Sequence, residues 1–564
     1  MLNLKKFFFS NNDNLINTDF KIIDDYIDNI RSQDVLFYDD IDLIYEKLLD
    51  EISVVLNDHF KLNFSLKYWR IIIGPWLRQF IDITYHRFSE IKNFNNYRKS
   101  SNVFYNSFVF DNQRVADDMN DWSFISNNDN WNSVFFSQIL NVLFPNNIYD
   151  EIILDFPKTK TNSILKFYFN KYINFLLLPF SKSFYYKTYF RFFSHFKIGL
   201  WTSLLRSKLN YTFLKPSILP NYKLRNSLKN KISSKYVCKE NSFEFVLLSL
   251  LFSHFPLAYL EWYNIIQKQM LNFYLPVNPK VIFSSNFLNS YDFLKFYTAF
   301  YTEGGSQLIV GQHGGHYALA NKCVYEDHEI KISNAYLSWG SSLTSLPFNV
   351  FNIGFIKFSL RTYIKTKFLS SINTPKKIVF VNAGINTYTY RLDDFVRPDS
   401  WFNYLEDTYK VIENVDENIK KNILINNHPT RLNQSNEFFL KHDSTLKFFE
   451  LKYNSLFNYK YIIVSTYNAT VFLEFIYYNI PTVIYLNPIF WKLRPNSSVI
   501  FEKLSNVGVF HTNHKSLSDF LNLNSNNISK WWFNENVQNA INDFRKLYLS
   551  DINYQIIRKT LFND

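Results

Sequence analysis

Two histidines lie within a cluster of glycines in the segment GQHGGHY, at residues 311–317. The chain has 11 glycines in all, and five of them fall between residues 304 and 315. Glycine lets backbone N–H groups approach a phosphate or carboxylate closely, and an imidazole can donate a hydrogen bond or move a proton. His313 is therefore a candidate catalyst, and a turn with surface histidines is the structural alternative. The expected anion-binding loop consists of Gly311, Gln312, Gly314, Gly315 and His316.

Acidic residues flank this loop and could act as a general acid, a base or a nucleophile. Glu326 and His328 belong to the charged run YEDHE, which follows the loop. Asp292 lies at the turn between an apolar run, VIFSS, and the next helical pattern. The structural alternatives are an exposed, charged helix start for YEDHE and an ordinary helix N-cap for Asp292.

A second group of polar residues follows two later apolar runs, in NNHPTR (426–431) and VSTYNATVFLE (464–474). A proline after a histidine restricts the backbone, and an arginine suits a phosphate. Hydroxyls at a helix start favour an anion, and an acidic residue one turn later could bind a ribose. Capping and a solvent-facing carboxylate are the alternatives. The candidate donor-binding residues are His428, Pro429, Arg431, Ser465, Thr466, Thr470 and Glu474.

Apolar, β-branched runs alternate with helical patterns, which predicts α/β units with parallel sheets. We expect an N-terminal lobe over residues 1–360, with a helical region at 1–270 and a Rossmann-like unit at about 278–345. A C-terminal Rossmann-like lobe should occupy 375–525, followed by terminal helices at 526–564. Its predicted strands lie at 376–383, 422–429, 460–470 and 481–488. The glycine loop and the second polar group both follow strands, where open α/β sheets bind ligands.

Bulk composition restricts the class of protein. The chain has 564 residues, 47% of them hydrophobic, which argues against disorder and favours two lobes. Two cysteines cannot build a disulfide framework, and no apolar run is long enough for a membrane span, so we expect a cytoplasmic protein. The formal charge of +12 favours phosphate-bearing partners. No Walker loop, HExxH, GxSxG or kinase motif is present.

Residues 155–240 combine basic and aromatic side chains, as in KFYFNKYINFLLLPF. Such a segment can form surface helices on anionic membranes, which would place the protein at the inner face of the cytoplasmic membrane. A core segment with solvated lysines is the alternative. No nucleic-acid recognition motif is visible, so we expect no nucleic-acid partner.

Several blocks resemble, in order and spacing, transferases encoded in bacterial O-antigen and surface-polysaccharide loci. The resemblance covers about residues 65–545 and rests on KYWRIIIGPWL, SSNFLNSYDFLKF, GQHGGHYALANKCVYEDHEIKISNAYLSWG, NNHPTR, STYNATVFLE, PTVIYLNPIFWKLR and VGVFHTNHKSLSDF. It implies a GT-B-like fold. The pairing of His-Pro with Ser-Thr is also similar to the CMP-binding motifs of sialyltransferases and bacterial Kdo transferases. On that analogy, His428 and Ser465 or Thr466 would contact CMP, and Asp292, Glu326 or His313 would be the nucleophile or base.

The resemblance implies glycosyl transfer from a nucleotide sugar, CMP-Kdo or CMP-nonulosonate, to a saccharide acceptor that is lipid-linked or nucleotide-linked. The donor would be a substrate, so no cofactor and no metal site are expected. A CDP-glycerol-type phosphotransferase is the alternative within enzymes. A basic scaffold that binds membrane or nucleic acid is the non-enzymatic alternative.

Overall fold

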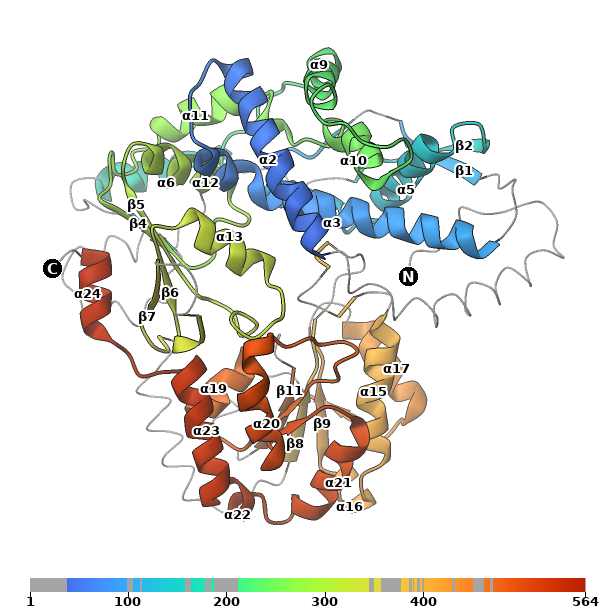
Figure 1. Ribbon diagram of the computed structural model, residues 1–564, viewed down its shortest axis with the longest axis vertical. Coiled ribbons are helices and arrows are strands. Elements are labelled where there is room, and N and C mark those ends of the chain that lie inside the picture. The colour runs from blue at the N-terminus through green and yellow to red at the C-terminus, as the bar shows by residue number, and fades with distance from the viewer. Residues whose placement is uncertain are drawn as a thin grey trace.

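The computed structural model describes most of the chain, and Figure 1 shows it as two lobes, one above the other. The described residues are 38–98, 105–111, 114–157, 164–177, 184–186, 211–343, 349–356, 377–384, 388, 390–392, 396–397, 400–428, 432–449, 461–466 and 470–562.

A parallel sheet forms the centre of the N-terminal lobe, with the strand order β3-β4-β5-β6-β7. Its strands are β3 (Phe184–Tyr186), β4 (Val281–Ser284), β5 (Gln307–Gly311), β6 (Ala335–Ser338) and β7 (Val350–Asn352). Helices α12 (Asp292–Glu303) and α13 (Val324–Ile332) connect β4 to β5 and β5 to β6. Strands β4 and β6 are buried along their whole length, as the run of apolar residues predicts for a sheet covered on both faces.

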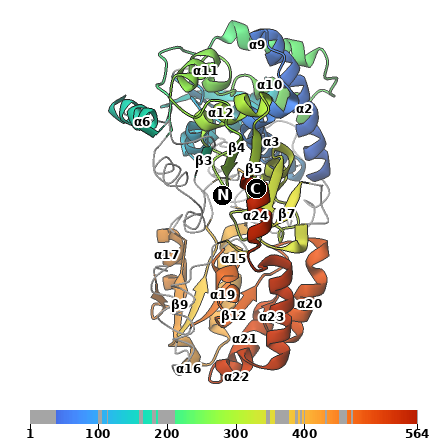
Figure 2. The same ribbon diagram turned by 90° about the vertical axis from the view of Figure 1, so that its left-hand side faces the viewer.

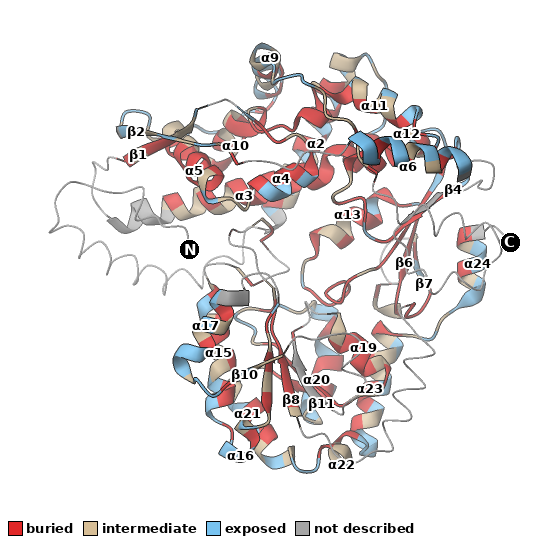
Figure 3. Cartoon of the chain, turned by 180° about the vertical axis from the view of Figure 1, so that it is seen from behind, coloured by how far each residue is buried: buried red, intermediate tan, exposed pale blue. Residues whose placement is uncertain are grey.

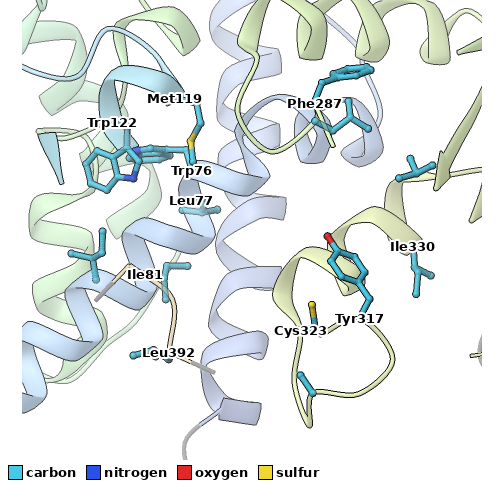
Figure 4. Close-up of a cluster of buried hydrophobic side chains, with 14 of the residues drawn as sticks. Trp76, Leu77, Ile81, Met119, Trp122, Phe287, Tyr317, Cys323, Ile330 and Leu392 are labelled. Carbon is cyan, nitrogen blue, oxygen red and sulfur yellow. The ribbon is translucent and has the colours of Figure 1, made fainter. Parts of the chain in front are cut away.

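A helical layer covers this sheet, built mainly around α2 (Tyr38–Phe60) and α3 (Leu66–Arg98). Trp76 of α3 packs with Phe80, and Figure 4 shows Trp76 beside Trp122 and Met119. Pro75 lies inside α3. The other helices of the layer are α4 (Met119–Ile125), α5 (Asp129–Leu143), α6 (Ile164–Leu177), α9 (Tyr222–Ser233), α10 (Phe243–Leu251) and α11 (Tyr263–Leu271).

The region expected to be helical also contains two strands, β1 (Tyr105–Phe110) and β2 (Ile148–Leu154), which pair in parallel as a separate sheet. Helices α4 and α5 lie between them in the chain. These two strands leave only a weak sequence pattern, because many of their residues are partly or fully exposed.

The C-terminal lobe has a six-stranded parallel sheet with the order β10-β9-β8-β11-β12-β13. Its strands are β8 (Lys377–Val381), β9 (Ile423–Asn426), β10 (Lys447–Phe448), β11 (Tyr461–Ser465), β12 (Thr482–Tyr485) and β13 (Phe510–His511). The surrounding helices are α15 (Trp401–Glu413), α16 (Glu417–Lys420), α17 (Leu432–His442), α19 (Val471–Tyr477), α20 (Ser498–Asn506) and α21 (His514–Asn524). The chain order reverses between β8 and β11, which makes this point the topological switch of a doubly wound sheet.

Loops of the two lobes are in direct contact. The loop after β5 pairs with the loop after β12, since Ala320 bridges Leu493 and the Arg494 N–H donates to Leu319 O at 2.8 Å. The carboxyl ends of the two sheets therefore meet. This arrangement confirms the predicted GT-B-like class of two Rossmann-like lobes.

The C-terminal segment crosses back to the N-terminal lobe. After α22 (Ile528–Trp532) and α23 (Glu535–Tyr548), Ser550 N–H donates to Trp339 O at 3.0 Å, and α24 (Tyr554–Phe562) lies beside β7 (Figure 1). A Cβ at Gly340 would lie 2.1 Å from Leu547 O, so only glycine permits this approach. Among the described residues, none of the helices is both long enough and apolar enough to span a membrane.

Candidate active site

The glycine loop after β5 packs tightly against itself. A Cβ at Gly314 would lie 2.9 Å from His316 Cε1 and 3.0 Å from the Tyr317 ring. The side chain of Gln312 closes the loop, because its amide donates to Gly314 O at 3.3 Å and its oxygen accepts from Trp339 N–H at 2.9 Å. Gln312 is buried, so it braces the loop from inside. The glycines thus permit close packing of rings against the backbone.

His313 is the partly exposed member of this loop, and its side chain is 22% exposed. Its Nε2 lies 3.3 Å from the Tyr317 hydroxyl, and its Nδ1 lies 3.8 Å from Glu329 Oε1. The Tyr317 hydroxyl also donates to Glu329 at 3.2 Å, and the Asn289 amide donates to it at 3.0 Å. Burial raises the pKa of Glu329 well above its usual value and so disfavours the charged carboxylate. A partly exposed imidazole therefore lies beside a buried acid.

The second histidine of the loop, His316, is buried. Burial lowers its pKa to about 3, and the charge of Arg391 acts in the same direction. His316 is therefore neutral, which suits a hydrogen-bonding residue better than a proton carrier.

Three other candidates of the N-terminal lobe lie in separate surroundings. Glu326 is buried and forms an ion pair with Arg494 of the other lobe, at 2.5 Å. His328 faces α3, where a Cβ at Gly74 would lie 3.1 Å from its ring, and burial lowers its pKa to about 3. Asp292 forms a buried ion pair with Lys295 at 2.5 Å. The structure thus groups His313 with Glu329 and Tyr317, and not with these three.

The donor-side candidates lie at the carboxyl edge of the C-terminal sheet. His428, just after β9, is exposed and packs over Gly384, where a Cβ would lie 2.3 Å from its Nδ1. Desolvation by neighbouring atoms lowers the pKa of His428. The Asn382 amide donates to Asn427 Oδ1 at 2.7 Å, which ties the end of β8 to the end of β9. This edge therefore presents a neutral imidazole on a braced backbone.

Thr466 is buried at the end of β11, next to the switch point. It lines a small pocket that includes Asn382, Tyr404, Asp407, Tyr485 and Asn487. Asp407 accepts from the Tyr485 hydroxyl at 2.5 Å and from the Asn487 amide at 3.1 Å. The pocket therefore contains several polar groups fixed in position, as a ligand-binding edge requires.

Of the remaining donor-side candidates, the structure describes the side chains of two and not those of the other three. Thr470 is the N-cap of α19 without a capping side-chain bond, and Glu474 of that helix is buried instead of solvent-facing. Helix α19 has only seven residues, so its dipole alone does not define a phosphate site. Pro429, Arg431 and the side chain of Ser465 lie outside the described residues.

Comparison with protein families identifies the chain. A family model described as "LIC12162 family transferase" matches residues 7–559. The chain belongs to this transferase family. Comparison with curated proteins gave no significant match.

One solved structure similar to this chain is titled "Crystal Structure of WaaG, a glycosyltransferase involved in lipopolysaccharide biosynthesis". The match has 8% sequence identity and a TM-score of 0.29, and it covers 54% of this chain and 96% of that chain.

The site of this transferase also contains residues whose role the sequence does not show. Tyr317 lies in GQHGGHY, and Glu329 is one of the possible acids of YEDHE, but only the fold places both beside His313. Arg391 comes from the loop after β8 and lies 4.4 Å from the Tyr325 ring, so the C-terminal lobe contributes a buried cation beside the glycine loop. No motif marks Arg391, because its position depends on contact between the lobes.

A pocket of about 340 Å³ opens near Asp292 in the N-terminal lobe. Its lining includes Asp118, Lys215, Tyr211 and Phe213. Asp118 is the N-cap of α4 and accepts from Asp121 N–H at 2.8 Å. Burial, and then the charge of Asp292, raise the pKa of Asp118 to about 7. A buried acid in a pocket thus titrates near neutral pH.

We expect Asp118→Asn to raise the thermal midpoint at pH 8 by about 2–6 °C and to change it little at pH 4.5. The folded pKa lies above the usual value of 3.8, so the stability contributed by the protonated acid is lost as pH rises from about 4 to 7. Asparagine keeps the capping acceptor and removes this titration. Differential scanning fluorimetry at both pH values tests the prediction. An equal shift at the two values would contradict it.

Proposed function

We propose that this transferase is a glycosyltransferase that moves a sugar from a nucleotide-activated donor to a saccharide acceptor of a surface polysaccharide. The observation that carries the proposal is that the carboxyl edges of the two parallel sheets meet. The N-terminal edge presents the accessible imidazole of His313, and the C-terminal edge presents His428 and Thr466 around the switch point. One edge can activate an acceptor hydroxyl while the other binds a nucleotide.

In the proposed reaction, the imidazole of His313 takes the proton of the acceptor hydroxyl. The acceptor oxygen bonds to the anomeric carbon as the bond from that carbon to the phosphate oxygen breaks. The nucleotide leaves with the electron pair, and His428 and the Thr466 hydroxyl stabilise its phosphate. Arg391 adds a positive charge near the loop, which favours an anionic donor. Closure of the lobes would exclude water from the reaction.

The proposed donor is a CMP-activated acidic sugar, of the Kdo or nonulosonic-acid class. Support comes from the similarity of His428-Pro429 and Ser465-Thr466 to CMP-binding motifs, and from the cationic side chain of Arg391 at the lobe interface. An acidic sugar carries a carboxylate in addition to the phosphate, and this cation would offset part of that charge.

Nucleotide binding tests the proposal. We expect CMP to raise the thermal midpoint selectively in a screen of CMP, CDP, UDP, GDP and ADP, since a ligand at 100 times its Kd stabilises by about 2.7 kcal/mol. His428→Ala should weaken CMP binding at least tenfold in calorimetry, because a buried or stacked polar contact is worth about 1.5 kcal/mol. His442→Ala, at the end of α17 and exposed, is the matched control.

Each outcome of the screen has a distinct meaning. Selective binding of UDP or GDP would show that the donor carries that nucleotide instead of CMP. Phosphate in the product would identify a CDP-glycerol-type phosphotransferase. Absence of any response would contradict a nucleotide site at this edge and favour a non-enzymatic scaffold.

A further inference from the structure

The positive charge of the chain is concentrated in one segment. Residues 156–239 contain 17 lysines and arginines and no aspartate or glutamate. The remaining 44 basic and 49 acidic residues give the rest of the chain a formal charge of −5. A segment with this imbalance is attracted to anionic surfaces.

Helix α6, within this segment, has its apolar residues on the outside. Its buried positions are Phe167, Asn170 and Asn174, which are spaced three and four residues apart along one face. Phe167 packs on Phe273 with ring centroids 5.1 Å apart, and the Tyr211 hydroxyl donates to Asn174 Oδ1 at 3.2 Å. This face attaches the helix to the lobe. The opposite face is exposed and consists of Ile164, Leu165, Tyr168, Phe169, Tyr172, Phe175 and Leu176.

The exposed face is unusual for a soluble surface. Leu165 is 84% exposed and Phe169 is 61% exposed, whereas two asparagines occupy the buried side. Large apolar residues gathered on one face mark an interaction site. Figure 2 shows α6 projecting from the body of the N-terminal lobe, and Figure 3 shows its outer surface as exposed.

We propose that the outward face of α6 docks on an anionic lipid bilayer. Rows of Leu, Phe and Tyr at helical spacing bury in the interfacial region of a bilayer, where Tyr places its hydroxyl near the headgroups. Lys166 is exposed on the helix, and Lys171 lies 5.4 Å from the ring of Tyr274, which extends the patch through its contact with Phe175. These lysines can reach the phosphates while their stems cover apolar surface. The helix has 14 residues, so it would lie along the surface and not span it.

Charge complementarity favours a bilayer over a second copy of this chain. Docking two α6 faces together would bring Lys166 and Lys171 of both copies close to one another, and helix α6 has no acidic residue to pair with them, so like charges would oppose association. An anionic membrane neutralises the same charge.

Docking would also bring the N-terminal pocket to the membrane. Tyr211, which holds Asn174 of α6, lines that pocket together with Asp118 and Asp292. The pocket would then lie within about one helix diameter, 10–12 Å, of the bilayer surface. A lipid-linked saccharide is the class of acceptor that such a position fits. Docking itself goes beyond the proposed reaction and does not depend on it.

Vesicle flotation of the full-length protein tests the proposal. We expect flotation with vesicles of phosphatidylglycerol and phosphatidylcholine, little flotation with phosphatidylcholine alone, and loss of binding at 0.5 M salt. Leu165→Asp/Phe169→Asp should lower the partition coefficient at least tenfold. Val499→Asp/Leu523→Asp, on exposed apolar positions of α20 and α21, adds the same charge elsewhere and should bind like the wild type.

The outcomes separate docking from folding and from self-association. Unchanged circular dichroism and thermal midpoint show that the α6 variant is folded. If the wild type does not float, or if the α6 variant floats as well as the control, the proposal is overturned. A concentration-dependent dimer in sedimentation velocity, lost in the α6 variant without any flotation, would assign the face to a second copy instead. CMP binding is measured on the same samples, so failure of docking is distinguishable from failure of the donor site.

Discussion

His313→Ala is expected to lower kcat by about 10²–10⁴-fold, the usual contribution of a positioned general base. The thermal midpoint should stay within a few degrees, because the imidazole is partly exposed and its bond to Tyr317 is long, at 3.3 Å. The effect is measured as the rate at which the nucleotide is released when donor and acceptor react. KM for the donor should change little, since the donor binds at the other edge.

A second variant separates catalysis by His313 from a structural role of its surroundings. Burial raises the pKa of Glu329 and disfavours its charged form, and Glu329→Gln removes that ionisable group while it retains an oxygen that accepts from Asn289 and Tyr317. We expect Glu329→Gln to retain kcat within about tenfold. His442→Ala, on the exposed end of α17, should be fully active. Equal activity of His313→Ala and the wild type would remove His313 from the mechanism, and unfolding of the variant would make it structural.

Strands β4, β5, β8, β9, β11 and β12 could be predicted from the sequence, because each is an apolar run rich in β-branched residues. The run at 281–285 is β4, at 281–284, and the runs at 376–383 and 481–488 are β8 and β12 with frayed ends. A buried parallel strand is apolar along its length, which makes it visible without alignment. Strands β1 and β2 were not predicted, because only part of their residues face a core.

The candidate site could be predicted only where its residues are close together in the sequence. The glycines, His313 and Tyr317 lie within seven residues of each other, so their proximity follows from the sequence. The role of Glu329 beside His313 requires the packing of α13 against the loop. The position of Glu326 depends on Arg494, which is 168 residues away in the chain. Local patterns contain no information on such contacts. The sequence therefore does not show which YEDHE residue lies beside His313 and which ones face α3 or the other lobe.

The ion pair between Glu326 and Arg494 gives the largest expected effect on stability. Glu326 is completely buried, and its other oxygen accepts from Ala318 N–H at 2.5 Å. We expect Arg494→Met to lower the free energy of unfolding by about 3–5 kcal/mol at pH 8, because removal of one partner leaves a buried carboxylate without its counter-charge. Urea denaturation measures this loss. Lys503→Met breaks the exposed pair with Asp543 and should cost less than about 1 kcal/mol.

The pH dependence of Arg494→Met shows whether the lost charge pair is the cause. Burial raises the pKa of Glu326 above its usual value even though Arg494 opposes this, so removal of Arg494 raises the pKa further. The folded protein then holds a proton that the unfolded chain releases above about pH 4.5, and stability falls as pH rises through this window. The deficit of Arg494→Met should therefore be smaller at pH 5 than at pH 8. Glu326→Gln/Arg494→Met should recover most of the stability at pH 8, since no buried charge remains. A deficit that is equal at both pH values and persists in the double variant would instead assign the loss to packing of the arginine stem between the lobes.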